Sequence, residues 1–242
     1  MTTDGVEAVR GGSGAERLAG FHLWLRTPAA SDRRLTGAGA LKSAEARYGA
    51  ASAVARQPTE AVTLPELTPP LASLRRSFSD AMAEFRAEGR GTEEDRAVIG
   101  GYLRARSAAW ADDEAFRAFS ASVRAEALEE SPRPEGFVPA TELWWVDGEE
   151  FLGRIAIRHR LTPRLLEIGG HIGYDVRPSA RRRGHATEML RQALTVARGL
   201  GIERALVTCD VDNVGSRAVI ERNGGILEDE RAGKLRFWTP TG

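Results

Sequence analysis

The stretch that decides the fold reads HIGYDVRPSARRRGHATEMLRQA, residues 171–193. Its first residues alternate apolar and polar side chains, which predicts a strand. Pro178 offers no N–H to a sheet ladder and ends that strand. After Gly184 the apolar positions recur every three or four residues, as in an amphipathic helix. The stretch therefore predicts a strand, a basic turn and a helix in direct succession.

The turn between the strand and the helix has the features of an anion site. The first turn of a helix leaves backbone N–H groups without partners, and the helix dipole adds partial positive charge there. A phosphate at that end satisfies both. Gly184 has no side chain to block the approach, and Arg181, Arg182 and Arg183 attract a polyanion. The alternative interpretation is a solvated, arginine-rich helix start.

The segments VRP and RRRGHA, residues 176–178 and 181–186, resemble the acetyl-coenzyme A signature of the GNAT superfamily of N-acetyltransferases. That signature runs Gln/Arg-x-x-Gly-x-Gly/Ala, and in the family the backbone amides of the turn hold the coenzyme's pyrophosphate. The resemblance implies a coenzyme-binding set on the strand and the turn, made of Tyr174, Val176, Arg181, Arg182, Arg183, Gly184, His185, Ala186 and Thr187.

A second match follows in DNVGSRAVIERNGG, residues 212–225. Acetyltransferases of this class carry Asn-x-x-Ser/Ala near a helix start and then Glu-Lys/Arg-x-Gly-Phe. Asn213 and Ser216 fit this pattern, whereas Gly225 replaces the phenylalanine. In the family the asparagine and the small residue lie against the pantetheine arm, so the resemblance assigns Asn213 and Ser216 to coenzyme binding. The alternative for Asn213, or for Asp212, is a helix N-cap.

The resemblance covers residues 61–242 and implies an α+β, α/β-like domain. Its mixed, mostly antiparallel central sheet would be flanked by helices, with a splayed strand pair at the coenzyme cleft. The sequence pattern suits this fold: helical periodicity over residues 71–129, a hairpin at Asp147-Gly148, then alternating strands and helices. A first strand is predicted over residues 61–67, and a helix start at Thr92, which precedes three acidic residues.

Residues 1–60 are predicted to form a flexible or poorly ordered extension, because they are rich in Ala, Gly and Arg and offer few apolar side chains. No part of the family resemblance covers them. We expect this segment to play no part in the chemistry.

The resemblance also implies a reaction, in which a primary amine of a small molecule or peptide attacks the thioester of acetyl-coenzyme A directly. Acetyl-coenzyme A would be a co-substrate, and no metal is implied. Such an attack needs a base, a donor for the developing oxyanion and an acid for the leaving thiolate. The donor implied by the family geometry is a main-chain N–H near Gly173 or Tyr174.

The catalytic side chains are harder to assign. Many family members place a tyrosine acid where this chain has Ile220, so Tyr174 or solvent would have to protonate the thiolate. The candidate bases are His171 and Glu142, each on a predicted strand, and the unperturbed pKa of a histidine suits the role. The alternatives are structural: a hydrogen-bonded strand histidine and a solvated edge carboxylate.

Composition restricts the partners. The chain has 34 basic and 34 acidic side chains, a balance that argues against a general nucleic-acid or membrane-surface binder. Cys209 is the single cysteine, so no intrachain disulfide forms. The start lacks a signal-peptide h-region, and no window approaches the ~20 apolar residues that cross a bilayer. We therefore expect a cytoplasmic protein, with a homodimer through exposed sheet edges as an open alternative to a monomer.

Two other functions compete with acetyl transfer. One is a non-catalytic sensor or scaffold module that binds coenzyme A with the same fold, an interpretation favoured by the missing tyrosine at Ile220. The other is a nucleotide-binding domain, but the chain contains neither a Walker loop nor a Gly-x-Gly-x-x-Gly turn. Release of free thiol from acetyl-coenzyme A with an amine present distinguishes the enzyme from the sensor.

Overall fold

One mixed sheet organises the part of the chain that the computed structural model describes, residues 64–95 and 97–242. Its seven strands lie in the order β1-β2-β3-β4-β5-β7-β6. Their bounds are β1 (Glu66–Thr68), β2 (Ala140–Asp147), β3 (Glu150–Arg158), β4 (Ile172–Val176), β5 (Arg204–Asp210), β6 (Ile226–Arg231) and β7 (Lys234–Pro240). The pair β4 and β5 is parallel and the other pairs are antiparallel. The predicted mixed, mostly antiparallel sheet of an α+β fold is confirmed.

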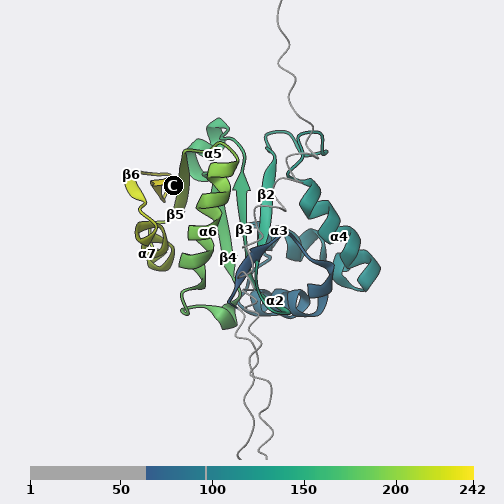
Figure 1. The fold of residues 1–242 in the computed structure, drawn as a ribbon. Helices are drawn as coiled ribbons and strands as arrows, with labels where there is room; N and C mark the ends of the chain where they lie inside the picture. The colour runs from purple at the N-terminus through teal and green to yellow at the C-terminus, as the bar shows by residue number, and fades with distance from the viewer. Residues whose placement is uncertain (1–63, 96) are drawn as a thin grey trace, which may run out of the picture.

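Helices cover both faces of this sheet (Figure 1). One layer holds α6 (His185–Gly199) and α7 (Val214–Arg222), and the other holds α2 (Arg75–Ala87), α3 (Val98–Ala105) and α4 (Asp113–Ala125). The shorter elements are α5 (Pro163–Ile168) and the 3-10 turns η1 (Ala72–Leu74), η2 (Ser107–Trp110) and η3 (Pro178–Ala180). We refer to the two sides of the sheet as the α6 side and the α2–α4 side.

Each face of the sheet buries its own hydrophobic core. Against α6 the core is mainly aliphatic and includes Ile155, Ile172 and Met189. Against α2–α4 it is mainly aromatic, with Phe78, Phe85, Phe116, Phe119, Trp144 and Phe151. Phe78 and Trp144 stack with their ring centroids 5.0 Å apart. Because successive residues of β2 enter opposite cores, its sequence LWWV is apolar throughout.

The local signals in the sequence locate most elements correctly. Gly148 turns the β2–β3 hairpin with a φ of 56°, in the left-handed region that glycine tolerates. Strand β4 ends just before Pro178, and α6 begins directly after Gly184. The predicted first strand extends outside the described residues, and its described part is the edge strand β1. The predicted extension over residues 1–60 also lies outside the described residues.

The helix start predicted at Thr92 is wrong, because α3 begins at Val98. The carboxylate of Asp95 explains the difference. It accepts hydrogen bonds from the Gly91 and Ala97 amides at 3.0 and 3.1 Å and pairs with Arg90 at 2.7 Å. These contacts hold the acidic segment as a loop, so Asp95 satisfies loop amides and Arg90 instead of a first helical turn.

The sheet opens between β4 and β5. Strand β4 pairs with β3 along its whole length, from Ile172 to Val176. Its pairing with β5 consists of one position, Ile172 opposite Val207. Beyond that position the two strands separate, and the splayed strand pair expected from the family resemblance is confirmed.

Candidate functional site

The backbone turn of residues 182–186, which we call the cradle, has free amide groups. Thr187 and Glu188 donate to the Gly184 carbonyl at 3.1 and 3.2 Å, whereas the cradle amides meet no acceptor among the described residues. Arg182 and Gly184 have φ values of 62° and 87°, so the backbone reverses twice within the turn. These free donors lie at the positive end of α6, where an anion binds most favourably.

None of the described residues fills the cradle. A Cβ atom added to Gly184 would meet no atom within 4 Å. The side chains of Arg182 and Arg183, the first two residues of the turn, are exposed. The cradle therefore has the open access and the positive charge that a diphosphate requires.

Two of the predicted coenzyme residues at the turn are engaged by the protein. The guanidinium of Arg181 holds both carboxylate oxygens of Glu88 at 2.6 and 2.8 Å, and its Nε donates to the Val176 carbonyl at 3.0 Å. His185 Nδ1 accepts a hydrogen bond from Trp145 Nε1 at 3.2 Å. Burial, and then Arg183, lower the pKa of His185, which favours its neutral form. These contacts fasten the turn to α2 and β2, and those two side chains position the cradle.

The hydrogen-bond pattern of β4 directs two amides into the opening of the sheet. Arg158 donates to the His171 carbonyl and Arg177 to the Leu152 carbonyl, both at 2.8 Å. Because alternate residues of an antiparallel strand face its partner, Gly173 bonds to β3, and the N–H groups of Tyr174 and Val176 face the gap. Of the two predicted oxyanion donors, this register favours the amide of Tyr174.

Three predicted residues meet across the gap. The Tyr174 hydroxyl lies 2.7 Å from the Ser216 Oγ, and the Ser216 amide donates to Asn213 Oδ1 at 2.9 Å. Asn213 is therefore the N-cap of α7, which confirms the alternative interpretation of this residue. Burial raises the pKa of Tyr174 to about 12, so the hydroxyl keeps its proton at neutral pH. Ile220, at the family's tyrosine position, is buried in the core beneath α7.

His171 has the environment of a structural residue. Its Nδ1 accepts a hydrogen bond from the Leu206 amide at 2.9 Å, and its own amide donates to the Leu206 carbonyl at 2.7 Å. Burial, and then Arg158, lower the pKa of His171 to about 4. Both contacts join β4 to β5 at the point where the gap begins. The geometry favours the structural alternative for His171 over the role of general base.

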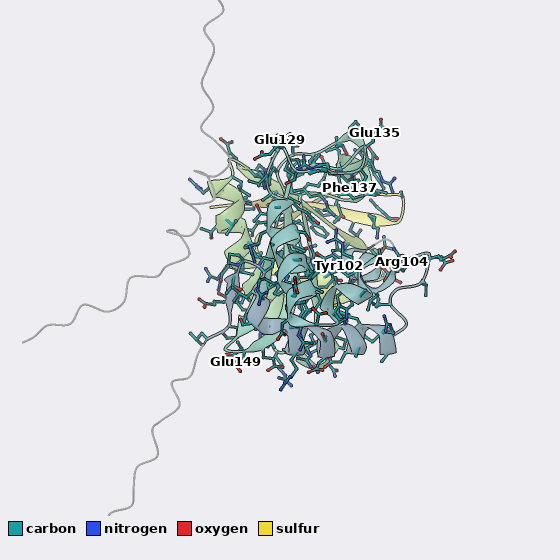
Figure 2. All side chains as sticks on the ribbon, turned by 90° about the vertical axis from the view of Figure 1, so that its right-hand side faces the viewer. Tyr102, Arg104, Glu129, Glu135, Phe137 and Glu149 are labelled. Carbon is teal, nitrogen blue, oxygen red and sulfur yellow. The ribbon has the colours of Figure 1, made fainter. Side chains whose placement is uncertain are left out.

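Glu142 is buried in an ion-pair network on the α2–α4 side of the sheet. It pairs with Arg154 at 2.7 Å and accepts hydrogen bonds from the Tyr102 hydroxyl and from Trp144 Nε1. Figure 2 shows Tyr102 on that side of the molecule. The expectation of a solvated edge carboxylate is wrong, because β1 pairs with β2 and α3 covers its face. These donors occupy the carboxylate and disfavour Glu142 as a general base.

The comparisons with known proteins identify the family. An acetyltransferase (GNAT) domain model matches residues 74–226. The chain belongs to the GNAT acetyltransferase family. Mycobacterium smegmatis RimJ, in complex with CoA-disulfide, has a similar structure at a TM-score of 0.50 and 18% identity, with 74% of this chain and 81% of that chain covered. No curated protein matches the sequence.

Two other solved structures align with this GNAT protein at lower TM-scores. The GNAT domain of S. lividans PAT has a TM-score of 0.48 at 14% identity, covering 73% of this chain and 90% of that one. The microcin C7 self-immunity acetyltransferase MccE has a TM-score of 0.47 at 14% identity, covering 72% and 91%. At such low sequence identities, structural similarity shows the fold alone. The structure that supports the fold here is RimJ, with its TM-score of 0.50.

Two further properties of the described part of this GNAT protein bear on its partners. Residues 64–95 and 97–242 contain no group of three or more His, Cys, Asp or Glu side chains arranged to hold a metal ion. None of the helices in the same ranges combines the length and the apolar character that a membrane span requires.

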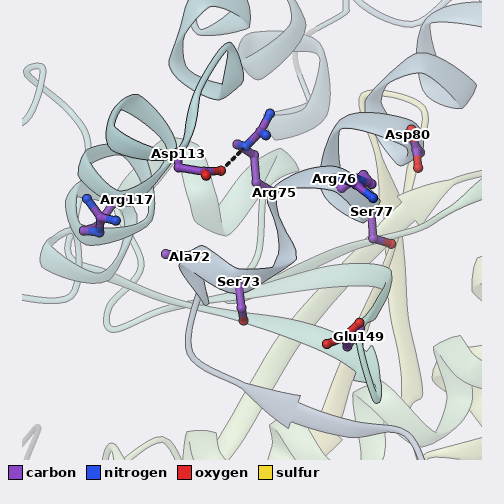
Figure 3. A pocket seen from close by; sticks show the side chains of 9 residues that line it. All are labelled: Ala72, Ser73, Arg75, Arg76, Ser77, Asp80, Asp113, Arg117 and Glu149. Atoms are coloured by element: carbon purple, nitrogen blue, oxygen red, sulfur yellow. Dashed lines mark hydrogen bonds and ion pairs between the residues drawn. The ribbon is translucent and has the colours of Figure 1, made fainter.

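A separate surface pocket lies at the start of α2, beside α4 (Figure 3). Its lining mixes basic and acidic side chains, and Arg75 and Asp113 form an ion pair within it. None of the predicted site residues lines this pocket. The cradle and the opened sheet are therefore the features that the family signature brings together.

Removing the charge of Glu142 should destabilise the fold. In Glu142→Gln, buried Arg154 loses its nearest counter-ion, and we expect the free energy of unfolding to fall by about 3–5 kcal/mol, measured by urea titration. Glu129→Gln is the matched control, because Glu129 pairs with Arg160 at an exposed position, where water screens the pair and the loss should be much smaller. Equal losses in the two variants would contradict a structural role for Glu142.

The lowered pKa of His171 predicts a pH dependence of stability. Between pH 6.5 and about 4, the unfolded chain takes up a proton at His171 that the folded protein does not. This contribution to stability is complete above pH 6.5 and is lost as the pH falls toward 4. In His171→Asn we therefore expect a weaker decline of the unfolding free energy over this window, measured by urea titration at several pH values. Parallel curves for the variant and the wild type would exclude the assignment.

Proposed function

We propose that this GNAT protein transfers the acetyl group of acetyl-coenzyme A to a primary amine of a small molecule or peptide. The observation that carries the proposal is the free-amide cradle directly beside the opened pair β4 and β5. The RimJ structure, which has the same fold, contains coenzyme A as CoA-disulfide. Its ligand supports the choice of coenzyme for this chain.

The cradle fits the pyrophosphate of the coenzyme. Backbone N–H groups and the α6 dipole complement its charge, and the missing Cβ of Gly184 permits close approach. The exposed guanidinium groups of Arg182 and Arg183 add attraction over a longer distance. The anion is thus held mainly by the main chain, which agrees with Arg181 being engaged by Glu88.

The gap beside β4 fits the pantetheine arm. An extended chain that carries amide groups can pair with the free edge of a strand in the same way as an added strand. The Val176 and Tyr174 amides supply that edge, because β5 pairs with β4 only at Ile172. Such pairing brings the thioester toward the Tyr174 amide.

The chemistry then follows from these groups. The amine nitrogen attacks the thioester carbon, a C–N bond forms, the C–S bond breaks, and the extra proton of the amine passes to solvent. The Tyr174 amide stabilises the negative charge that develops on the carbonyl oxygen. The protonated Tyr174 hydroxyl, 2.7 Å from Ser216 Oγ, donates its proton to the leaving thiolate and regains one from solvent.

A screen of primary amines tests acetyl transfer directly. With acetyl-coenzyme A present, we expect amine-dependent release of free thiol for at least one acceptor class, followed by a thiol-reactive dye. Tyr174→Phe should lower kcat by about 10²-fold or more, the usual range for a lost general acid, with little change in coenzyme affinity. Coenzyme binding without thiol release for any amine would favour the sensor function, and an unchanged kcat would exclude Tyr174 as the acid.

The cradle is tested by adding charge to it. Gly184→Glu places a carboxylate where phosphates would bind, and we expect calorimetric titration to show no binding of acetyl-coenzyme A. Gly201→Glu is the matched control, since Gly201 also has a left-handed φ, 83°, with open space at its Cβ, just beyond the other end of α6. The control should bind normally. Normal binding by a folded Gly184→Glu protein would refute the cradle.

A further inference from the structure

Among the residues that the structure describes, only carbonyl oxygens hold the partly buried cation of Arg158. Its Nη1 donates to the Gly169 and Gly170 carbonyls at 3.0 and 3.1 Å. Within the described ranges, no carboxylate lies within ion-pair distance of this guanidinium. Arg154, four residues earlier on the same face of β3, instead pairs with Glu142 at 2.7 Å and with Asp175 at 3.3 Å. The sheet therefore carries one neutralised arginine and, beside it, one whose charge is unmatched.

The surroundings of Arg158 make its positive charge unfavourable. Burial, and then the neighbouring charge of Arg154, lower the pKa of Arg158 to about 10. A buried cation ordinarily acquires an anionic partner, because removal from water is unfavourable without one. An anion supplied from outside the described part of the chain would offset this cost.

The guanidinium of Arg158 lies over the strand that borders the gap. A Cβ atom added to Gly173 would meet only Arg158 Nη1 and Nη2, each at 3.9 Å. Gly173 adjoins Tyr174, whose amide faces the gap. An added Cβ would thus be in van der Waals contact with the guanidinium, so Arg158 lies directly over the strand position next to Tyr174.

The register of the sheet places Arg158 on the side from which an acceptor would arrive. Gly173 lies opposite Ala156, and Asp175 opposite Arg154, so these positions share a face with Arg158. That face is the α2–α4 side, because Arg154 contacts Glu142 there, whereas α6 and the cradle lie on the other side. With the coenzyme entering from the α6 side, the α2–α4 side of the gap is left for the acceptor.

We propose that Arg158 binds a carboxylate of the acceptor, and that the acceptors of this enzyme are accordingly small amino carboxylic acids. The inference rests on the proposed acetyl transfer and names its substrate class. Gly173 lies between the cation of Arg158 and the carboxylate of Asp175, which Arg90 and Arg154 hold at 3.4 and 3.3 Å. This order of charges along the face complements an amino acid, with its carboxylate toward Arg158 and its ammonium toward Asp175.

The experiment compares each free amino acid with its amide and with a matched amino phosphonate. Wild-type protein should acetylate at least one amino acid with a kcat/KM at least about 10-fold above that of its amide, the value of one charge-assisted hydrogen bond. The phosphonate shows whether Arg158 selects carboxylates or any anion. A higher kcat/KM for the phosphonate than for the carboxylate would overturn the choice of a carboxylate.

Variants distinguish loss of recognition from structural damage. The measured quantity is the ratio of kcat/KM for the amino acid to kcat/KM for its amide, determined within each protein. Arg158→Gln should reduce the preference for acid over amide to about one, and Arg158→Lys, which keeps the charge, should retain part of it. Arg124→Gln is the control, since Arg124 also donates to a main-chain carbonyl, that of Pro70, just beyond the edge strand β1. An unchanged preference in both Arg158 variants would overturn the proposal.

A binding measurement distinguishes failure of this inference from failure of the proposed function. Saturation-transfer NMR with coenzyme A present should detect amino acids more strongly than their amides, and Arg158→Gln should abolish the difference. Such binding without turnover of any amine would uphold the carboxylate site and reject acetyl transfer. Turnover of amines with no preference for a carboxylate would uphold acetyl transfer and reject the site. Absence of both preference and selective binding would likewise overturn the inference.

Discussion

The structure depends on how β4 is paired. Strand β4 is hydrogen-bonded to β3 along its full length and to β5 at one position. The first interaction fixes the strand, and the second holds the two halves of the sheet together while leaving the far edge of β4 free. His171 secures the junction by bonding both ways to Leu206. A coenzyme arm can therefore pair with β4 without disrupting the sheet.

The cradle adjoins this open edge because the chain turns directly from β4 into α6. The turn is fastened from two sides, by Arg181 to Glu88 and by His185 to Trp145. These contacts fix the cradle amides before any ligand binds, so little conformational entropy remains to be lost on binding. The arginines of the signature thus divide their roles: Arg181 positions the turn, while the exposed Arg182 and Arg183 supply charge.

On the α2–α4 side of the sheet, β2, β3 and β4 carry charged side chains beside an aromatic core. Burying Glu142, Arg154 and Asp175 beside an aromatic cluster is costly unless every charge is paired, and these three are. Arg158 breaks that rule among the described residues. Because it lies over Gly173 at the opened edge, the exception coincides with the place where an acceptor must meet the thioester.

The sequence by itself determined the strand, turn and helix of residues 171–199, because alternation, Pro178, Gly184 and helical periodicity are local signals. It also placed the N-cap at Asn213 among its alternatives. Only the tertiary structure decided the environments of Glu142, His171 and Arg158. Glu142 meets Tyr102 across 40 residues of sequence and His171 meets Leu206 across 35, so no local pattern records these contacts. Burial and charge pairing arise from segments brought together by folding, and they decide which side chains remain available for chemistry.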